Sequence, residues 1–162
     1  MTLHLFHADL HNPHHASDLL SMLDSYARDP MGGGEPLSAD CRARLIAELQ
    51  KRPATHAFLA YAGDQAAGLA ICFEGFSTFA CKPLLNIHDF AVDPAFRGQG
   101  IGRQLMAFIS DYAKQHDFCK LTLEVLEGNH AAQALYRAQG FAQYELNPAM
   151  GGAVIMQKKL GE

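Results

Sequence analysis

A glycine-rich junction between two apolar runs constrains this chain more than any other feature. Residues 97–102 read RGQGIG, a strand-like run at 84–92 precedes them, and residues 101–115 carry apolar side chains at helical spacing. Amides at the start of a helix lack partners within the helix and lie at the positive end of its dipole. A loop without bulky side chains can turn those amides toward an anion, most often a phosphate. The three glycines would permit such a bend.

Two familiar phosphate loops fit this junction poorly. A Walker loop requires Gly-Lys followed by a hydroxyl residue, whereas position 103 is arginine. A Rossmann fingerprint places GxGxxG after the first strand of a βαβ unit, whereas this GxGxG lies beyond the middle of the chain. Arg97, immediately before the glycines, would add a bidentate donor for phosphate. The alternative, an ordinary strand-to-helix turn, stays open on the glycines alone.

The rest of the chain predicts one α/β (α+β) domain spanning residues 1–162. Helices are predicted over 14–28, 38–51, 101–115 and 129–139, the last of them ending at Gly140. Strands are predicted over 2–7, 57–62, 67–74, 84–92, 121–127 and 153–160. Hairpin strands come first and strand–helix–strand crossings later. The sheet should therefore be mixed, with an antiparallel N-terminal part and a parallel pair farther on.

Composition excludes several classes of partner. The formal net charge of −4 argues against nucleic acid, and no apolar run approaches the roughly 18 residues of a membrane span. The four cysteines are scattered without a CxxC pair, which argues against a disulfide framework or a zinc knuckle. The N-terminal histidines also lack zinc-ligand spacing, so no metal is expected. The start of the chain lacks the pattern of a signal peptide, and we expect a cytoplasmic protein.

Two separate motifs give the chain a family resemblance. Residues 97–102 match the pattern Arg/Gln-x-x-Gly-x-Gly/Ala, and residues 129–141 match N-x-x-A-x-x-L-Y-x-x-x-G-F. In this order and spacing, the motifs resemble those of the GNAT superfamily of acyl-CoA-dependent N-acetyltransferases. The resemblance implies acetyl-CoA as acyl donor, a sheet of six to seven strands with a splayed parallel pair, and about four helices. It also implies a homodimer.

The resemblance assigns roles around the cofactor. The residues implied in binding acetyl-CoA are Phe90, Ala91, Val92, Arg97, Gly98, Gln99, Gly100, Ile101, Gly102, Arg103, Asn129 and Tyr136. The amide of Val92 would polarise the thioester carbonyl. Tyr136 would protonate the departing sulfur. A phenol near pKa 10 gives its proton to a thiol near 8.5 at a cost of roughly 2 kcal/mol. Tyr136 must therefore be helped by its surroundings or act mainly as a hydrogen-bond donor.

The acceptor amine must lose a proton before it can attack. His88 and Asp89 are the candidate bases, with a water chain as a third possibility. The two side chains would project from opposite faces of a regular strand, although a bulge would alter that. Asp89 could instead bind the substrate cation.

The acceptor is predicted to be a small primary amine. The stretch Phe76-Ser77-Thr78-Phe79 and the later Asn86–Phe90 resemble the spermidine/spermine (diamine) acetyltransferase-like subgroup, although His88 stands where that subgroup has an acidic residue. Candidate substrate-binding residues are Tyr26, Asp29, Glu35, Phe79 and Asp89. Two alternatives remain: an enzyme acting on a protein lysine or N-terminal amine, and a non-catalytic acyl-CoA-binding sensor.

Overall fold

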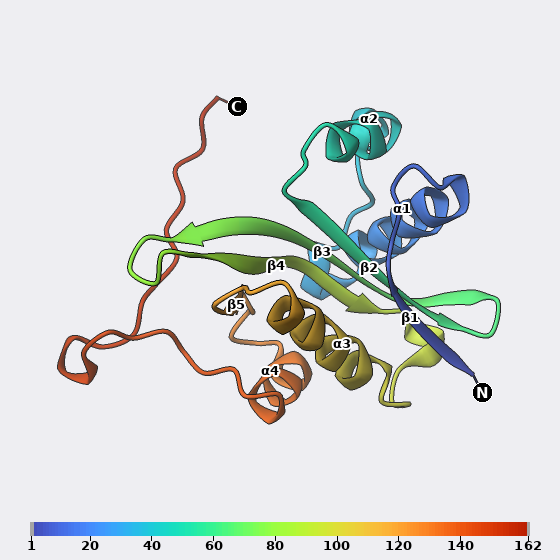
Figure 1. Cartoon of the computed structure of the whole chain (residues 1–162). Helices are drawn as coiled ribbons and strands as arrows, with labels where there is room; N and C mark the ends of the chain where they lie inside the picture. Colours follow the sequence, from blue (N-terminus) through green and yellow to red (C-terminus); the bar gives the residue numbers. More distant parts are fainter. Residues whose placement is uncertain (1, 162) are drawn as a thin grey trace.

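The computed structural model describes residues 2–161 as a mixed sheet with helices on both faces (Figure 1). The strands are β1 (Leu3–His7), β2 (Thr55–Ala62), β3 (Gln65–Ser77), β4 (Lys82–Val92) and β5 (Leu121–Leu123). The helices are α1 (Pro13–Arg28), α2 (Ala39–Gln50), α3 (Ile101–Gln115) and α4 (His130–Ala138). Short 3-10 turns lie at η1 (Pro30–Gly32), η2 (Pro94–Phe96) and η3 (Pro148–Met150).

The sheet order is β1-β2-β3-β4-β5, antiparallel from β1 to β4 and parallel between β4 and β5. The predicted mixed sheet is therefore confirmed. The parallel pairing runs only from Leu85↔Leu121 to Ile87↔Leu123, whereas β4 continues to Val92. Beyond Ile87, the β5 side of β4 has no strand beside it within residues 2–161. The last five residues of β4, 88–92, thus present an open edge.

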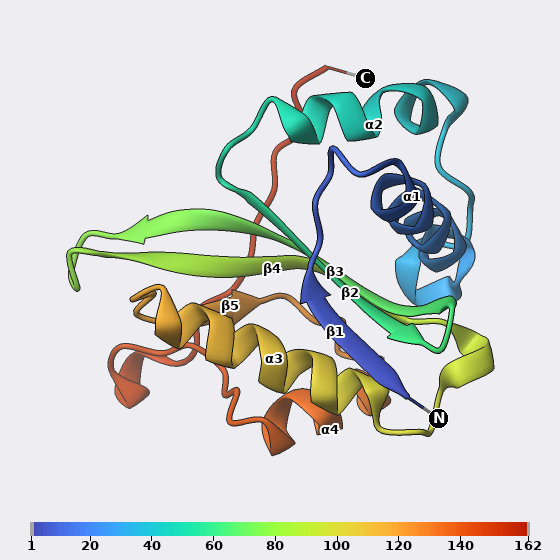
Figure 2. The ribbon, with the colours of Figure 1, turned by 45° about the vertical axis from the view of Figure 1, so that its right-hand side comes forward.

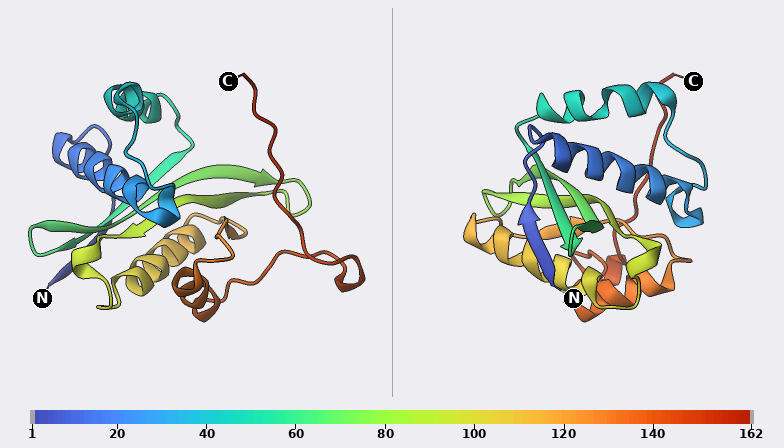
Figure 3. Two further views of the ribbon diagram at one scale, coloured as in Figure 1. Left: turned by 180° about the vertical axis from the view of Figure 1, so that it is seen from behind. Right: turned by 90° about the vertical axis from the view of Figure 1, so that its right-hand side faces the viewer.

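Each face of the sheet carries its own apolar core. Helices α1 and α2 cover one face, and α3 and α4 cover the other (Figures 2 and 3). On the α1 side, Leu19, Met22 and Leu23 pack on Leu59, Leu69 and Ile71. On the α3 side, Leu105, Met106 and Ile109 pack on Phe58, Leu85 and Ile87. None of the helices in the described range is both long and apolar enough to pass through a membrane.

Side chains cap three of the four α-helices at their first turn. Asn12 accepts hydrogen bonds from the amides of His14 and His15 before α1, and Pro13 occupies the first helical position. Ser38 caps α2, and Asn129 caps α4. The four predicted helices are therefore confirmed to within about two residues at each end.

The C-terminal part of the chain contradicts two predictions. The sheet has five strands rather than six to seven, because residues 153–160 form no strand. Val154, Ile155 and Met156 are three consecutive apolar residues, all more than 70% exposed, and they lack the alternation that buries one face of a strand. The predicted strand at 121–127 is also shortened to Leu121–Leu123, where its pairing with β4 ends.

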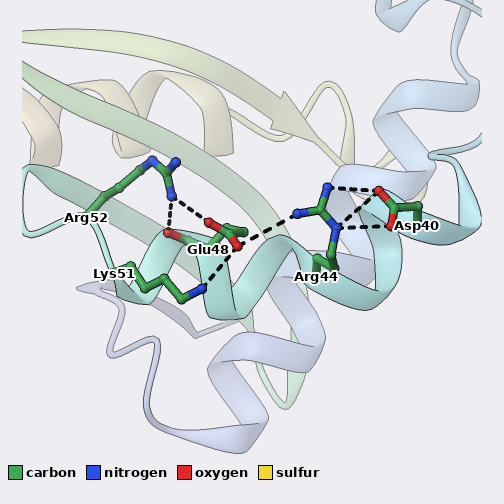
Figure 4. A network of polar contacts seen from close by, with 5 residues as sticks. All are labelled: Asp40, Arg44, Glu48, Lys51 and Arg52. Carbon is green, nitrogen blue, oxygen red and sulfur yellow. Dashed lines mark hydrogen bonds and ion pairs between the residues drawn. The ribbon is translucent and has the colours of Figure 1, made fainter.

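An exposed ion-pair network runs along α2 (Figure 4). Arg44 bridges Asp40 and Glu48, one turn to either side, and Glu48 also pairs with Lys51 and Arg52. Exposed pairs of this kind contribute little to stability, because water and salt screen the charges. The network stabilises α2 locally, away from the open edge of β4.

Candidate active site

A β-bulge at His88 shapes the open edge of β4. Ile71 of β3 pairs with Asp89 and Cys72 pairs with Ile87, so His88 is an extra residue between two successive pairs. Asp89 lies opposite Ile71, whose side chain belongs to the α1-side core. His88 contacts Phe73 of the same core edge-on, with ring centroids 5.6 Å apart. The bulge therefore places His88 and Asp89 on the same face, the α1 face. In a regular strand the two side chains would lie on opposite faces.

Asp89 and His88 lie in different surroundings on that face. Asp89 is half-buried, and burial raises the pKa of its carboxyl above the usual value, with a partial offset from nearby His88. The His88 side chain is exposed. Asp89 also lies close enough to Tyr26 of α1 to raise the pKa of that phenol, which burial already raises. A half-buried carboxylate with a raised pKa binds a proton more readily than an exposed one, which suits the role of a general base.

Two tyrosines approach the open edge from opposite layers. Tyr136 of α4 is 8% exposed and packs edge-on against Phe90 of β4, with centroids 6.0 Å apart. Burial, together with Tyr26 across the edge, raises the pKa of Tyr136 to about 12. Phe90 faces the α3 side and Asp89 the α1 side, so β4 separates the two phenols. A thioester lying along this edge would have Tyr136 on one side and Asp89 on the other.

The start of α3 is built differently from the other helix starts. Gly100 occupies the cap position with φ 78°, and no side chain caps the helix. Gly98 also has φ 78°, and a Cβ at either glycine would meet no atom within 4 Å. Both positions require the left-handed conformation that glycine adopts readily. The first α3 amides, from residues 101–103, are thereby left for an external acceptor.

Gly102 serves packing rather than the bend. A Cβ there would lie 3.2 Å from Leu135 of α4 and 3.4 Å from Val92 of β4. The absence of a side chain lets α3 approach both elements closely. Ile101 is 2% exposed and belongs to the core, so only its backbone is available to a ligand. Gln99 and Arg103 have exposed side chains beside the same helix start.

Arg97 joins the helix start to the segment after α1. Its Nη2 lies 3.2 Å from Asp29 Oδ2, and its Nε donates to the Val92 carbonyl at 3.3 Å. Arg97 lines a small hollow between α1 and the end of β4 with Tyr26, Ala91 and Val92. Met22 and Ser25 complete its α1 wall. Sequence reasoning named neither of them as a site residue, although their helical spacing to Tyr26 and Asp29 could have identified them.

The structure gathers some predicted site residues and disperses others. Asn129 caps α4 by accepting from the Ala132 amide at 3.2 Å, which leaves its amide nitrogen as the group that could contact a cofactor. Glu35 is exposed, with its backbone amide bonded to the Ala27 carbonyl. Phe79 is 93% exposed at the tip of the β3–β4 hairpin, roughly 20 Å along the strand from Asp89. Neither Glu35 nor Phe79 joins the group around Asp89.

Comparison with known proteins gives independent evidence on the family of this chain. The sequence model of the acetyltransferase (GNAT) family matches residues 19–141. N-alpha-acetyltransferase RimI of Mycobacterium tuberculosis is 36% identical over 88 residues, which are 53% of this chain and 54% of that protein. Thialysine N-epsilon-acetyltransferase of Caenorhabditis elegans is 29% identical over 125 residues, 76% of this chain and 75% of that protein. The chain spans about half the length, or less, of some curated relatives it matches.

Among solved structures, an aminoglycoside acetyltransferase from an uncultured soil metagenomic sample superposes with a TM-score of 0.76 at 18% identity. The match covers 98% of this chain and 97% of that one, and it shows a shared fold. The family model spans α3, the glycine junction and the Asn129–Phe141 motif. The chain therefore belongs to the acetyltransferase (GNAT) family.

Proposed function

We propose that this protein is an acetyl-CoA-dependent N-acetyltransferase that acts on a primary amine of a small molecule, with a diamine, polyamine or amino-acid-like amine as acceptor. The observation that carries the proposal is the open edge of β4, which has Asp89 on its α1 face, Tyr136 against its α3 face and the uncapped start of α3 after its end. We assign residues 1–162 to a single acyl-CoA domain. The four cysteines are all free thiols, which supports a reducing, cytoplasmic location.

The residues present fit a coenzyme A diphosphate. Gly98 and Gly100 leave open space beside the first α3 amides, and Arg97 supplies a guanidinium next to them. When bound, acetyl-CoA supplies an activated acetyl thioester. Backbone groups of Phe90, Ala91 and Val92 on the open edge of β4 would hold and polarise its carbonyl. The Asn129 amide nitrogen would add a contact from the α4 side.

The protein groups divide the proton chemistry. Asp89 would accept the proton that the acceptor ammonium must lose. His88 beside it is exposed and would not act as the base. Tyr136 remains protonated at neutral pH because its pKa is about 12, so its O–H can donate to the departing sulfur. Full proton transfer from a phenol of that pKa to a thiol near 8.5 would cost roughly 5 kcal/mol. Tyr136 therefore acts as a hydrogen-bond donor that stabilises the developing negative charge.

A second candidate acceptor is a protein N-terminal amine. The RimI relative and several ribosomal protein bS18-alanine N-acetyltransferases, 36–40% identical over 55–66 residues, favour it. The thialysine acetyltransferase relative favours a small amine and matches a longer part of the chain. The non-catalytic sensor is disfavoured because Tyr136 and Asp89 are both placed at the open edge.

The proposal is tested by binding and then by turnover. Thermal shift with acetyl-CoA should raise the unfolding temperature, whereas NAD and ATP should not; stabilisation by NAD or ATP alone would overturn the assignment. Release of the CoA thiol across a panel of amines and N-terminal peptides then identifies the acceptor. The pH profile of kcat/KM distinguishes the acceptors, because an α-amine titrates near 8 and an alkylamine near 10.

We also propose that the protein works as a homodimer. The support is a set of exposed apolar side chains in the C-terminal segment, defined here as residues 142–161: Tyr144, Leu146, Met150, Val154, Ile155, Met156 and Leu160. Figure 1 shows that this segment runs away from the sheet and helices. Contiguous exposed apolar residues mark interaction sites.

A further inference from the structure

A single ion pair connects the cofactor side of the site to the acceptor side. Arg97 and Asp29 are 68 residues apart in sequence, and Arg97 Nη2 lies 3.2 Å from Asp29 Oδ2. Asp29 is 24% exposed at the side chain, and the hydrogen bond from the Met31 amide, followed by the contact with Arg97, holds the pKa of its carboxyl below the usual value. The contact therefore favours an ionised Asp29 at neutral pH.

Asp29 also organises the segment 29–37, which we call the α1–α2 loop. Its Oδ1 accepts from the Met31 amide at 2.9 Å, and its carbonyl accepts from the amides of Gly32 and Gly34. The loop packs tightly on the end of α1, because a Cβ at Gly32 would overlap the Tyr26 carbonyl. Asp29 thus stabilises the α1–α2 loop, which packs on α1 near Tyr26, and it also binds the guanidinium of Arg97.

We propose that Asp29 is a positioning residue that couples cofactor binding to the α1–α2 loop through competition for Arg97. This inference rests on the proposed function, because it takes Arg97 as a ligand of the CoA diphosphate. In the structure, Arg97 is shared between Asp29 and the Val92 carbonyl. A diphosphate at the start of α3 offers Arg97 a more highly charged partner and leaves Asp29 without its counter-charge.

The consequence is positive coupling between the cofactor site and the acceptor site. Once Arg97 turns to the diphosphate, the α1–α2 loop loses its tether to the β4–α3 junction, and the hollow beside Tyr26 becomes accessible to the acceptor. Coupling of this kind is reciprocal, so releasing the loop must also favour the cofactor. Acetyl-CoA should therefore raise the affinity for the acceptor, and the acceptor should raise the affinity for acetyl-CoA by the same factor.

The test compares the wild-type protein with Asp29→Asn. Asparagine keeps an oxygen that can accept from Met31 but removes the charge that holds Arg97. Acetyl-CoA affinity, measured by isothermal titration calorimetry, should increase roughly two- to fivefold, the range expected when an exposed ion pair no longer competes. In hydrogen exchange, acetyl-CoA should accelerate exchange of residues 29–37 in the wild type. In Asp29→Asn, exchange there should already be fast and should not change on binding.

Two variants separate the coupling from a simple change of charge. Asp93→Asn removes a carboxylate beside Arg97 from a residue with the same cap geometry, since Asp93 Oδ1 accepts from the Ala95 amide at 2.8 Å. It should leave the response of the α1–α2 loop to acetyl-CoA intact, whatever its effect on affinity. Asp40→Asn breaks the exposed Asp40–Arg44 pair on α2 and should change neither acetyl-CoA affinity nor loop exchange (Figure 4).

The outcomes distinguish this inference from the function on which it rests. A wild-type protein that does not bind acetyl-CoA would overturn the proposed function. A wild-type protein that binds acetyl-CoA, but whose α1–α2 loop exchanges at the same rate or more slowly on binding, would overturn only the coupling. That wild-type measurement decides the question even if Asp29→Asn fails to fold. Equal affinity and equal loop exchange in the wild type and Asp29→Asn would also overturn the coupling.

Discussion

Asp89 must be ionised to accept a proton, in a place where burial favours its neutral form. The pKa of Asp89 is raised in the folded protein, so the carboxylate ionises less readily there than in the unfolded chain. The ionised Asp89 therefore lowers the free energy of unfolding at pH values above that raised pKa. The pair Ile71↔Asp89 directs the carboxyl toward Tyr26 rather than toward solvent. A residue that costs stability at the open edge of the sheet is best explained by chemistry.

We expect Asp89→Asn to lower kcat by about 10²- to 10⁴-fold, the range for loss of a positioned general base. The unfolding temperature should not fall, because asparagine carries no charge to desolvate. His88→Gln, on the same bulge, is the matched control and should retain kcat within about threefold, as expected for an exposed side chain. Larger loss in His88→Gln than in Asp89→Asn, measured as CoA release, would assign the base to His88.

Tyr136→Phe separates hydrogen bonding from proton transfer. Losing a hydrogen bond to a charged group costs about 1.5–3 kcal/mol, so kcat should fall by about 10- to 150-fold with little change in acetyl-CoA affinity. With a pKa of about 12, Tyr136 stays protonated throughout the working range, so the variant should keep the wild-type shape of its pH–kcat profile between pH 7 and 10. Tyr144→Phe, at a 53% exposed tyrosine, is the control. Unchanged turnover in Tyr136→Phe would remove its assigned role.

The motifs predicted which residues would surround the cofactor, but not the separate part that each would play. Sequence alone treats the three junction glycines alike, whereas backbone angles give Gly98 and Gly100 the bend and packing gives Gly102 the close approach. Asp29 was predicted to bind substrate, and its ion pair with Arg97 depends on a contact between residues 68 positions apart. His88 and Asp89 lie on the same face of the sheet because of a β-bulge. The bulge is visible only from the register between β3 and β4, which the sequence of one strand does not reveal.

At the scale of elements, a histidine cluster joins β1, β2 and the end of α3. His7 Nε2 lies 3.1 Å from His56 Nδ1, His56 Nε2 lies 2.7 Å from Glu74 Oε1, and the His7 ring stacks on Tyr112 at 5.0 Å. Partial burial, then His56 and His116, lower the pKa of His7 below its usual value. Protonation is therefore less favourable in the folded protein, so stability is lost as pH falls through the unfolded value near 6.5.

We expect protonation of His7 to lower the unfolding temperature between pH 7.5 and 5.5, by no more than about 4 °C because His7 is partly exposed. Asp89, whose pKa is raised, contributes in the opposite direction as its carboxyl takes up a proton. The carboxylates with lowered pKa values, Asp29, Asp40 and Glu48, lose their stabilising charge only at more acidic pH. His7→Gln should flatten the dependence in this range, measured by differential scanning calorimetry. His4→Gln, on the same strand, should not; an equal flattening there would contradict the role of His7.

Elements with local signals were predicted well, and elements that need a distant partner were not. Asn12, Ser38 and Asn129 fix three helix starts through bonds to amides two or three residues on. A strand is defined by its neighbour, and β5 ends at Leu123 because its parallel pairing with β4 ends there. Residues 153–160 have a strand-like composition but pair with no other strand within residues 2–161, and the Ala153 amide donates to the Tyr144 carbonyl instead.

At the scale of the whole molecule, the C-terminal segment is the part whose side chains the fold does not bury. Leu146, Met150 and Leu160 are 76%, 81% and 91% exposed, although the same chain buries most of its other large apolar residues in two continuous cores. Leaving such a surface in water is unfavourable by about 25 cal/mol for each Å². Association of two copies through this segment would remove it from solvent.

We therefore expect the full chain to elute as a dimer in size-exclusion chromatography with light scattering. Ile155→Asp, which places a charge at a 72% exposed apolar residue, should shift it to a monomer without lowering the unfolding temperature of the cores, because Ile155 contributes to neither. Gln157→Asp adds the same charge two residues away at a residue that is already polar, and it should remain a dimer. A monomeric wild type, or a dimer that survives Ile155→Asp with Val154→Asp, would show that this segment does not join two copies.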